Sequence, residues 1–263
     1  MPEGHTIHRL ALDHSDRFVG RTVTVTSPQD RFAAASRLDG QVMSDVEAYG
    51  KHLLYRFGEA GWVHIHLGLF GKIWTKPTPL EPARSTVRMR LATIEWFADL
   101  VGPTQCMLID ADERAALFQR LGPDPLRTDA VPDAAWQKLS KSRQPVAALL
   151  MDQHVIAGIG NAFRAELLYR AGLNPHVEGT RLTFGQWQML WRDAQRMMRL
   201  GVRANRIVTT RPEDRERRHG RVQPSDATYV YRRAEMPCRR CGSMVLMEPL
   251  AGRRLYWCPS CQR

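Results

Sequence analysis

Four cysteines near the C-terminus constrain the fold of this chain more than any other feature. They form two pairs, each with two intervening residues, and sixteen residues separate the pairs: Cys238, Cys241, Cys258 and Cys261. This spacing is typical of a tetrahedral four-cysteine zinc site. Residues 229–263 are too few to hold a core unaided, and structural zinc contributes about 10–16 kcal/mol of apparent binding energy. The spacing therefore predicts one structural Zn²⁺ in a C-terminal ribbon, whose hairpin carries Arg253 near its tip.

The composition restricts the class of protein. The 263 residues carry a formal net charge of +11, which favours a polyanion such as nucleic acid as the partner. No apolar run is long enough to span a membrane, and no secretory segment follows the start. Cysteines spaced for metal, with Cys106 left as a small core residue, indicate a reduced compartment. We therefore expect a cytoplasmic, nucleoid-associated protein with no membrane partner. Because no self-complementary apolar helix stands out, we expect it to be a monomer.

Residues 1–126 are predicted to form a helix followed by a β-rich domain. The first apolar residues after Gly4 lie on one helical face, and Gly20 is placed to end that helix: Ile7, Leu10, Ala11 and Phe18. Short β-rich runs at 22–25, 52–55, 62–65 and 87–91 then predict a β-sandwich or barrel. The linker at residues 121–126 closes this domain.

Residues 127–228 are predicted to be mainly helical. Asp133 is expected to N-cap a helix through Leu139. Further helices are expected at 146–151, 162–171 and about 184–200. The arginine-rich stretch 203–228 has no regular pattern and is interpreted as a mobile loop. The predicted domains are therefore 1–126, 127–228 and 229–263.

A Gly-Ile-Gly-Asn turn, residues 158–161, precedes one of these helices. A helix N-terminus presents backbone N–H groups and the positive end of the helix dipole, so the turn is suited to bind an anion. Two roles remain open for Asn161: the N-cap of the helix, or a ligand to phosphate. In a basic chain with a zinc ribbon, we favour a contact with the DNA backbone.

The chain begins Met1-Pro2-Glu3, and a proline at this position is small enough for removal of Met1. The mature protein would then start with a secondary amine that can attack an aldehyde carbon to form an iminium. An α-amine titrates near ~8 and lysine near ~10.4, so at pH 7 the terminus is unprotonated roughly two hundred times more often. On these residues alone, the alternative that only Met1 is lost stays open.

Together these residues resemble the formamidopyrimidine-DNA glycosylase and endonuclease VIII family of base-excision enzymes. The matching motifs run along the whole chain in the family's order: Pro2-Glu3, Gly50-Lys51-His52-Leu53-Leu54, His66-Leu67-Gly68-Leu69-Phe70-Gly71, residues 121–126, residues 150–153, Gly160-Asn161, Tyr231 and the ribbon ending Cys261-Gln262. The resemblance implies an α+β fold. An N-terminal helix and a two-layer β-sandwich would form the catalytic domain, followed by a helix-two-turn-helix DNA-binding domain and a zinc finger.

The resemblance also implies roles at double-stranded DNA that contains oxidised bases or abasic sites. Pro2 would attack the sugar C1′, and Glu3 would assist ring opening and loss of the base. Lys51 would contact phosphate and help β-elimination. Asn161 and Arg253 would hold the phosphates beside the flipped nucleotide, and Arg253 would also assist δ-elimination.

Leu69 and Phe70 form an apolar pair between two glycines, and such a pair could fill the gap that a flipped nucleotide leaves. The alternative is a core pair at the end of a strand. Gly68 and Gly71 favour an exposed turn.

Two branches of the family are distinguished by this region. The Gly-Leu-Phe-Gly run and the Pro2-Glu3-Gly4 start are closer to the endonuclease VIII branch, which implies oxidised pyrimidines as substrates. A purine-directed glycosylase and a non-catalytic module that binds damaged DNA are the alternatives. Thr6 departs from the pattern, because many relatives carry a glutamate there.

Overall fold

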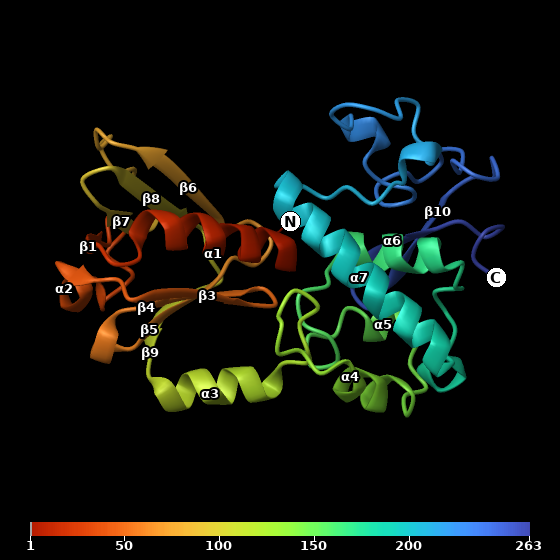
Figure 1. Ribbon diagram of the computed structural model, residues 1–263, viewed down its shortest axis with the longest axis horizontal. Coiled ribbons are helices and arrows are strands. Elements are labelled where there is room, and N and C mark those ends of the chain that lie inside the picture. Colours follow the sequence, from red (N-terminus) through yellow and green to blue (C-terminus); the bar gives the residue numbers. More distant parts are fainter. Residues whose placement is uncertain (1) are drawn as a thin grey trace. The chain divides into compact units, whose positions relative to one another are not determined.

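The computed structural model describes residues 2–263, and the chain divides into two compact units (Figure 1). Unit 1 is Met1–Arg120 and unit 2 is Leu121–Arg263. No helix in residues 2–263 has both the length and the apolar character required to cross a membrane.

Unit 1 contains one long helix, two antiparallel sheets and two further helices. One sheet has the order β3-β4-β5-β9 and the other the order β2-β1-β7-β8-β6. The helices are α1 (Gly4–Phe18), α2 (Ala35–Leu38) and α3 (Ala111–Arg120). The strands are β1 (Thr22–Thr26), β2 (Gln41–Val42), β3 (Asp45–Tyr49), β4 (His52–Arg56), β5 (Trp62–His66), β6 (Lys72–Pro77), β7 (Val87–Ala92), β8 (Trp96–Val101) and β9 (Gln105–Ile109).

The inner faces of the two sheets share one core with α1. That core contains, among others, Val25 and Leu91 from one sheet with Leu53 and Ile65 from the other. His14 of α1 joins the layers, because its ring nitrogens lie 2.7 Å from the Tyr55 hydroxyl and 2.8 Å from the Thr75 hydroxyl. The predicted N-terminal helix and sandwich are confirmed. Gly20 follows α1 with φ +76°, a left-handed conformation that favours glycine.

Unit 2 is helical and ends in a two-stranded ribbon. Its helices are α4 (Pro132–Leu139), α5 (Val146–Leu149), α6 (Asn161–Ala171) and α7 (Phe184–Ala204), and its strands are β10 (Leu246–Leu250) and β11 (Arg253–Trp257). A capping box begins α7: Thr183 accepts the N–H of Gln186, and the Gln186 side chain accepts the N–H of Thr183. One face of α7 packs against α6 through Trp187, Leu190 and Met198.

Three predicted details of the unit 2 helices are wrong. Asp133 does not cap α4, because the helix begins at Pro132 with Val131 as the N-cap residue. Proline is well suited to the first helical position, and the Asp133 carboxylate instead lies in the first turn, where the helix dipole favours it. In addition, α7 continues to Ala204, one turn beyond the predicted end, and α5 ends at Leu149.

Candidate active site and nucleic-acid interface

One end of the β3-β4-β5-β9 sheet brings together two of the predicted site segments. Strand pairing sets Tyr49 opposite His52 and His52 opposite His66. The β3–β4 turn with Lys51 and the turn after β5, residues 67–71, must therefore lie at the same end of the sheet.

Helix α1 starts at this same end. Beyond its last turn, the Gly20 N–H donates to the Met43 carbonyl at 2.8 Å. Met43 lies just before β3, whose first residue Asp45 pairs with Arg56 at the far end of the sheet. The 15-residue helix is about 22 Å long and a five-residue strand is about 17 Å. The first turn of α1 therefore reaches the end of the sheet where the β3–β4 turn lies, as Figure 1 also shows.

Pro2 and Glu3 immediately precede this first turn. Pro2 is half-buried, whereas the Glu3 side chain is only 1% exposed. Glu3 caps α1 through its backbone, since its carbonyl accepts the Thr6 N–H at 2.9 Å and its side chain makes no capping bond. The carboxylate is thus held inside the protein, one residue after Pro2. Burial is the main cause that lowers the pKa of His66, and the positive charge of Lys51 is the second. The Lys51 charge therefore lies close to His66, at the same end of the sheet.

His5 and Thr6 follow Glu3 in the first turn of α1. The Thr6 hydroxyl lies 3.3 Å from Nε2 of His5. Burial, with the positive chain terminus as the second cause, lowers the pKa of His5 to about 4. The imidazole is therefore neutral at pH 7 and adds no charge to the first turn of α1.

Leu69 and Phe70 occupy an exposed turn. Phe70 is 85% exposed and Leu69 is 40% exposed. The Gly71 N–H closes the turn on the Leu67 carbonyl at 3.0 Å. Gly68 has φ +66°, and a Cβ there would lie 1.9 Å from the Thr104 hydroxyl. The exposed turn is confirmed, and the alternative of a strand-end core pair is wrong.

Three histidines lie on the sheet face that points away from α1, next to the Lys51 turn. His52 Nδ1 is 2.8 Å from His64 Nε2, and the His52 and His66 rings lie 5.0 Å apart. Burial, with the neighbouring histidines as the next cause, lowers the pKa of His52 to about 3. The pKa of His64 falls to about 4 for the same reasons. The cluster is therefore uncharged at neutral pH.

Acid should destabilise unit 1 through this cluster. The unfolded histidines bind protons near pH ~6.5 and the folded ones near 3 and 4, so the free energy of unfolding falls as pH drops below ~6.5. By pH 5 each such histidine should cost roughly 2 kcal/mol. The free energy of unfolding, measured with urea, should fall between pH 7 and pH 5 in both proteins. The fall should be about 2 kcal/mol smaller in His52→Asn than in wild type. The exposed His219→Asn serves as the control, and equal losses in wild type and His52→Asn would contradict the assignment.

In unit 2, Asn161 connects α6 to the ribbon. It is the first residue of α6, the N-cap residue is Gly160, and no side chain caps the helix. Of the two roles left open for Asn161, the N-cap role is therefore wrong. Its Nδ2 donates to the Arg254 carbonyl at 2.8 Å, while its Oδ1 accepts a hydrogen bond from the fully buried Arg164. Since Arg164 is only a donor, it fixes which side of the Asn161 amide faces the ribbon.

Arg253 lies at the tip of the ribbon. It is the first residue of β11 and is exposed, and it follows the turn made by Ala251 and Gly252. The predicted hairpin with arginines at its tip is confirmed. The Asn161 side chain binds the carbonyl of Arg254, which is the residue after Arg253. Asn161 and Arg253 are therefore linked through two peptide units.

The four cysteine thiols meet in one cluster. Their Sγ atoms all lie within 4.8 Å of one another, with 3.8 Å between Cys238 and Cys261 and 3.5 Å between Cys241 and Cys258. Tetrahedral zinc with Zn–S bonds of ~2.3 Å requires sulfur atoms about 3.8 Å apart, whereas a disulfide requires ~2.05 Å. The donor set therefore fits zinc. When bound, the metal would cross-link the two ends of the ribbon and leave no open coordination position.

Sequence reasoning missed a second anchor, Glu166 on α6. Its buried carboxylate accepts the backbone N–H groups of Tyr229, Val230 and Tyr231, each at 2.8 Å, and the Thr209 hydroxyl. Three consecutive N–H groups form a binding site for an anion. The base of the ribbon is thus tied to α6. The only sequence signal is a charged residue inside a helix whose other positions are mostly apolar.

Replacing this carboxylate should destabilise unit 2. In Glu166→Gln the amide NH₂ would face the backbone N–H groups, and the buried donors would lose their shared acceptor. We expect a loss of about 2–4 kcal/mol in the free energy of unfolding, measured by urea denaturation. Glu213→Gln, an exposed change of the same chemistry, should lose less than about 0.5 kcal/mol. Equal midpoints for the two variants would show that the Glu166 network contributes little.

Comparisons with known proteins were made for the whole chain. The Formamidopyrimidine-DNA glycosylase N-terminal domain matches residues 1–106, and the Formamidopyrimidine-DNA glycosylase H2TH domain matches residues 121–212. Endonuclease 8 1 of Mycobacterium tuberculosis is 47% identical over 268 residues, and Endonuclease 8 of Escherichia coli is 30% identical over 271 residues; both matches cover 100% of each chain. The DNA-(apurinic or apyrimidinic site) lyase Nei2 of Mycolicibacterium smegmatis is 32% identical over 269 residues, which is 100% of this chain and 99% of that one.

The fold agrees with solved structures. A complex between wild-type Lactococcus lactis Fpg and DNA that contains an oxidised pyrimidine matches with a TM-score of 0.82 at 22% identity, covering 100% of both chains. The fold and these matches define the class of protein as a DNA repair glycosylase. The chain belongs to the formamidopyrimidine-DNA glycosylase and endonuclease 8 family, whose class of activity is DNA glycosylase and AP lyase.

Proposed function

We propose that the protein removes oxidised pyrimidines from double-stranded DNA and then cleaves the strand by β,δ-elimination. One observation carries this proposal: the start of the chain, the Lys51 turn and the Leu69-Phe70 turn lie at one end of unit 1. A nucleophilic amine, a buried carboxylate and a cation are the groups that this chemistry needs. A DNA substrate also suits the net charge of +11 and a nucleoid-associated location.

The Pro2 amine is the nucleophile in this mechanism. Its nitrogen forms a bond to C1′ of the damaged nucleotide while the bond from C1′ to the base breaks. Glu3 acts as the acid that assists opening of the sugar ring and departure of the base, and the ring-opened sugar remains on Pro2 as an iminium. Loss of a proton from C2′ then expels the 3′ phosphate, and Lys51 holds the phosphate during this β-elimination.

Asn161 and Arg253 act on the DNA backbone. The Nδ2 of Asn161 carries two hydrogens, and the Arg254 carbonyl accepts only one of them. We assign the other hydrogen to a phosphate next to the flipped nucleotide, at the positive end of the α6 dipole. The exposed Arg253 binds a neighbouring phosphate and assists δ-elimination, and the zinc ribbon holds it in place.

Leu69 and Phe70 fill the gap in the duplex. A nucleotide that leaves the stack costs a few kcal/mol, and apolar side chains that enter between bases offset this cost. The 85% exposure of Phe70 supports this role, because an aromatic ring left in water has no packing function in the free protein. The same turn supports the preference for oxidised pyrimidines, as does the 47% identity to a protein named Endonuclease 8 1.

Borohydride trapping tests the function and the substrate together. Duplexes with one thymine glycol, one 8-oxoguanine or one abasic site would each be incubated with the protein and borohydride. We expect covalent protein–DNA bands with thymine glycol and with the abasic site, and at least about tenfold less with 8-oxoguanine, since each 1.4 kcal/mol in the barrier is tenfold. A stronger band with 8-oxoguanine would move the enzyme to the purine branch. Phe70→Ala should lose more trapping on thymine glycol than on the abasic site, where no base must be extruded.

A further inference from the structure

The exposed face of α7 carries a row of arginines that none of the proposed chemistry uses. Their spacing of four, three and four residues sets them on one side of the helix over about 16 Å: Arg192, Arg196, Arg199 and Arg203. None of them forms an ion pair within residues 2–263. The only carboxylate of α7 is Asp193. It already forms an ion pair with Arg170, which donates two hydrogen bonds to it at 2.6 and 2.7 Å. The row is therefore a cationic surface without counter-charges of its own.

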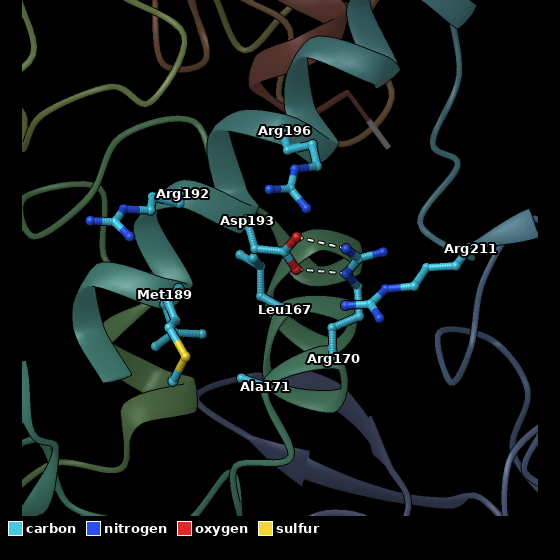
Figure 2. Close-up of a pocket in the computed structure, with 9 residues that line it drawn as sticks. Leu167, Arg170, Ala171, Met189, Arg192, Asp193, Arg196 and Arg211 are labelled. Carbon is cyan, nitrogen blue, oxygen red and sulfur yellow. Dashed lines mark hydrogen bonds and ion pairs between the residues drawn. The ribbon is translucent and has the colours of Figure 1, made fainter. Parts of the chain in front are cut away.

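A pocket of about 300 Å³ opens beside this row, between α6 and α7 (Figure 2). Its floor is apolar and comes from both helices: Leu167, Ala171, Met189 and Leu190. Arg192 and Arg196 form one part of its rim and Arg211 another. The Arg170–Asp193 pair is fixed within it, because Arg170 also donates to the Thr209 carbonyl at 2.6 Å. The pocket is thus a preformed hollow with apolar side chains in its floor and arginines at its rim.

We propose that this face docks an acidic peptide segment of a partner protein, one with several carboxylates and a large apolar side chain. The carboxylates would pair with the α7 arginines, whose planar guanidinium groups match a carboxylate in two bonds. The apolar side chain would enter the pocket, whose volume is enough for one leucine or phenylalanine. Charge and shape are both required for this fit.

Nucleic acid fits this face less well. Duplex phosphates would pair with the arginines but would leave the apolar floor unused. Single-stranded DNA could place a base in the pocket, yet bases in such sites stack on aromatic side chains, and the residues that line this pocket include none. The site also lies entirely in unit 2, so it does not depend on Pro2 or on the glycosylase reaction.

Fluorescence anisotropy tests the proposal with a defined probe. A fluorescein-labelled peptide of four aspartates, a glycine and a C-terminal phenylalanine should bind the full-length protein at micromolar concentrations. The same peptide with serine in place of phenylalanine should bind about tenfold more weakly, because the apolar contact is lost. Arg192→Glu/Arg196→Glu should weaken the phenylalanine peptide at least about tenfold. Ala171→Leu, which fills the floor without changing charge, should remove the difference between the two peptides.

Two controls separate this site from general charge and from the DNA site. Lys141→Glu/Arg143→Glu changes the net charge by the same amount as Arg192→Glu/Arg196→Glu, at exposed residues elsewhere on unit 2. Its affinity for the phenylalanine peptide should stay within about twofold of wild type. Cleavage of an abasic-site duplex by Arg192→Glu/Arg196→Glu should stay within about twofold of wild type. Equal binding of both peptides would overturn the proposal. A loss of duplex binding and cleavage in the α7 variant, without peptide binding, would assign the face to DNA.

Discussion

Replacement of Pro2 by glutamine should abolish borohydride trapping and reduce base excision by more than about 10³-fold. A bulky second residue prevents removal of Met1, so the terminal amine moves one residue away from the buried Glu3 carboxylate. The iminium then has no correctly placed nitrogen. The measurement is the rate of covalent complex formation on an abasic-site duplex, with the intact mass of each protein used to confirm whether Met1 is present.

Pro2→Gly is the matched control for this prediction. Glycine allows Met1 to be removed and leaves a primary amine at the same place, so trapping should be slower than in wild type but clearly detectable. Both variants should bind DNA as wild type does, because Pro2 lies outside the proposed phosphate contacts. Wild-type trapping by Pro2→Gln with Met1 retained would remove Pro2 as the nucleophile.

Cys258→Ala should cause the largest structural change expected of any single substitution in unit 2. Cys258 is fully buried and its thiol belongs to the four-cysteine cluster. With three ligands the metal site is incomplete, and much of the roughly 10–16 kcal/mol of binding energy is lost. We expect zinc content to fall from about one to near zero per chain and β10–β11 to lose protection from hydrogen exchange. DNA affinity should fall about 100-fold, because Arg253 and the partner of Asn161 are no longer held.

Cys106→Ala provides the comparison within the same chain. Cys106 is half-buried on β9 of unit 1, far in sequence from the ribbon, and burial raises the pKa of its thiol to about 12. Its removal should leave zinc content and DNA affinity unchanged. If Cys258→Ala kept one zinc and bound DNA like Cys106→Ala, the cluster would not be the structural centre of the ribbon.

Local patterns predicted much of the fold correctly. The apolar face of α1, the alternating strands and the cysteine spacing each depend on residues close together in the chain, and all three are confirmed. The N-cap prediction for Asp133 and the alternative N-cap role of Asn161 failed for a related reason: the preference of one residue competes with that of its neighbour. Pro132 took the first position of α4 ahead of Asp133, and Gly160 took the N-cap position that was one of the two roles left open for Asn161.

The candidate site was predictable where the chemistry of single residues is distinctive. An N-terminal proline beside a glutamate, and a glycine-flanked Leu69-Phe70 pair, are visible in the sequence alone. The contacts of Asn161 and Glu166 with the ribbon and its base were not, because these contacts join residues 63 to 93 positions apart. Nothing in a local window shows that a carboxylate on α6 will meet three N–H groups at the base of the ribbon.

The sequence by itself determined the long N-terminal helix, several of the strands and helices, and the spacing of the four clustered cysteines, since spacing and residue chemistry carry that information. Only the tertiary structure decided that the chain terminus, the Lys51 turn and the Phe70 turn share one end of a sheet. Strand register and the direction of α1 decide that arrangement, and both depend on contacts between distant residues. The same is true of the arginine face on α7: its charges follow from the sequence, but the apolar pocket beside it exists only because α6 packs there.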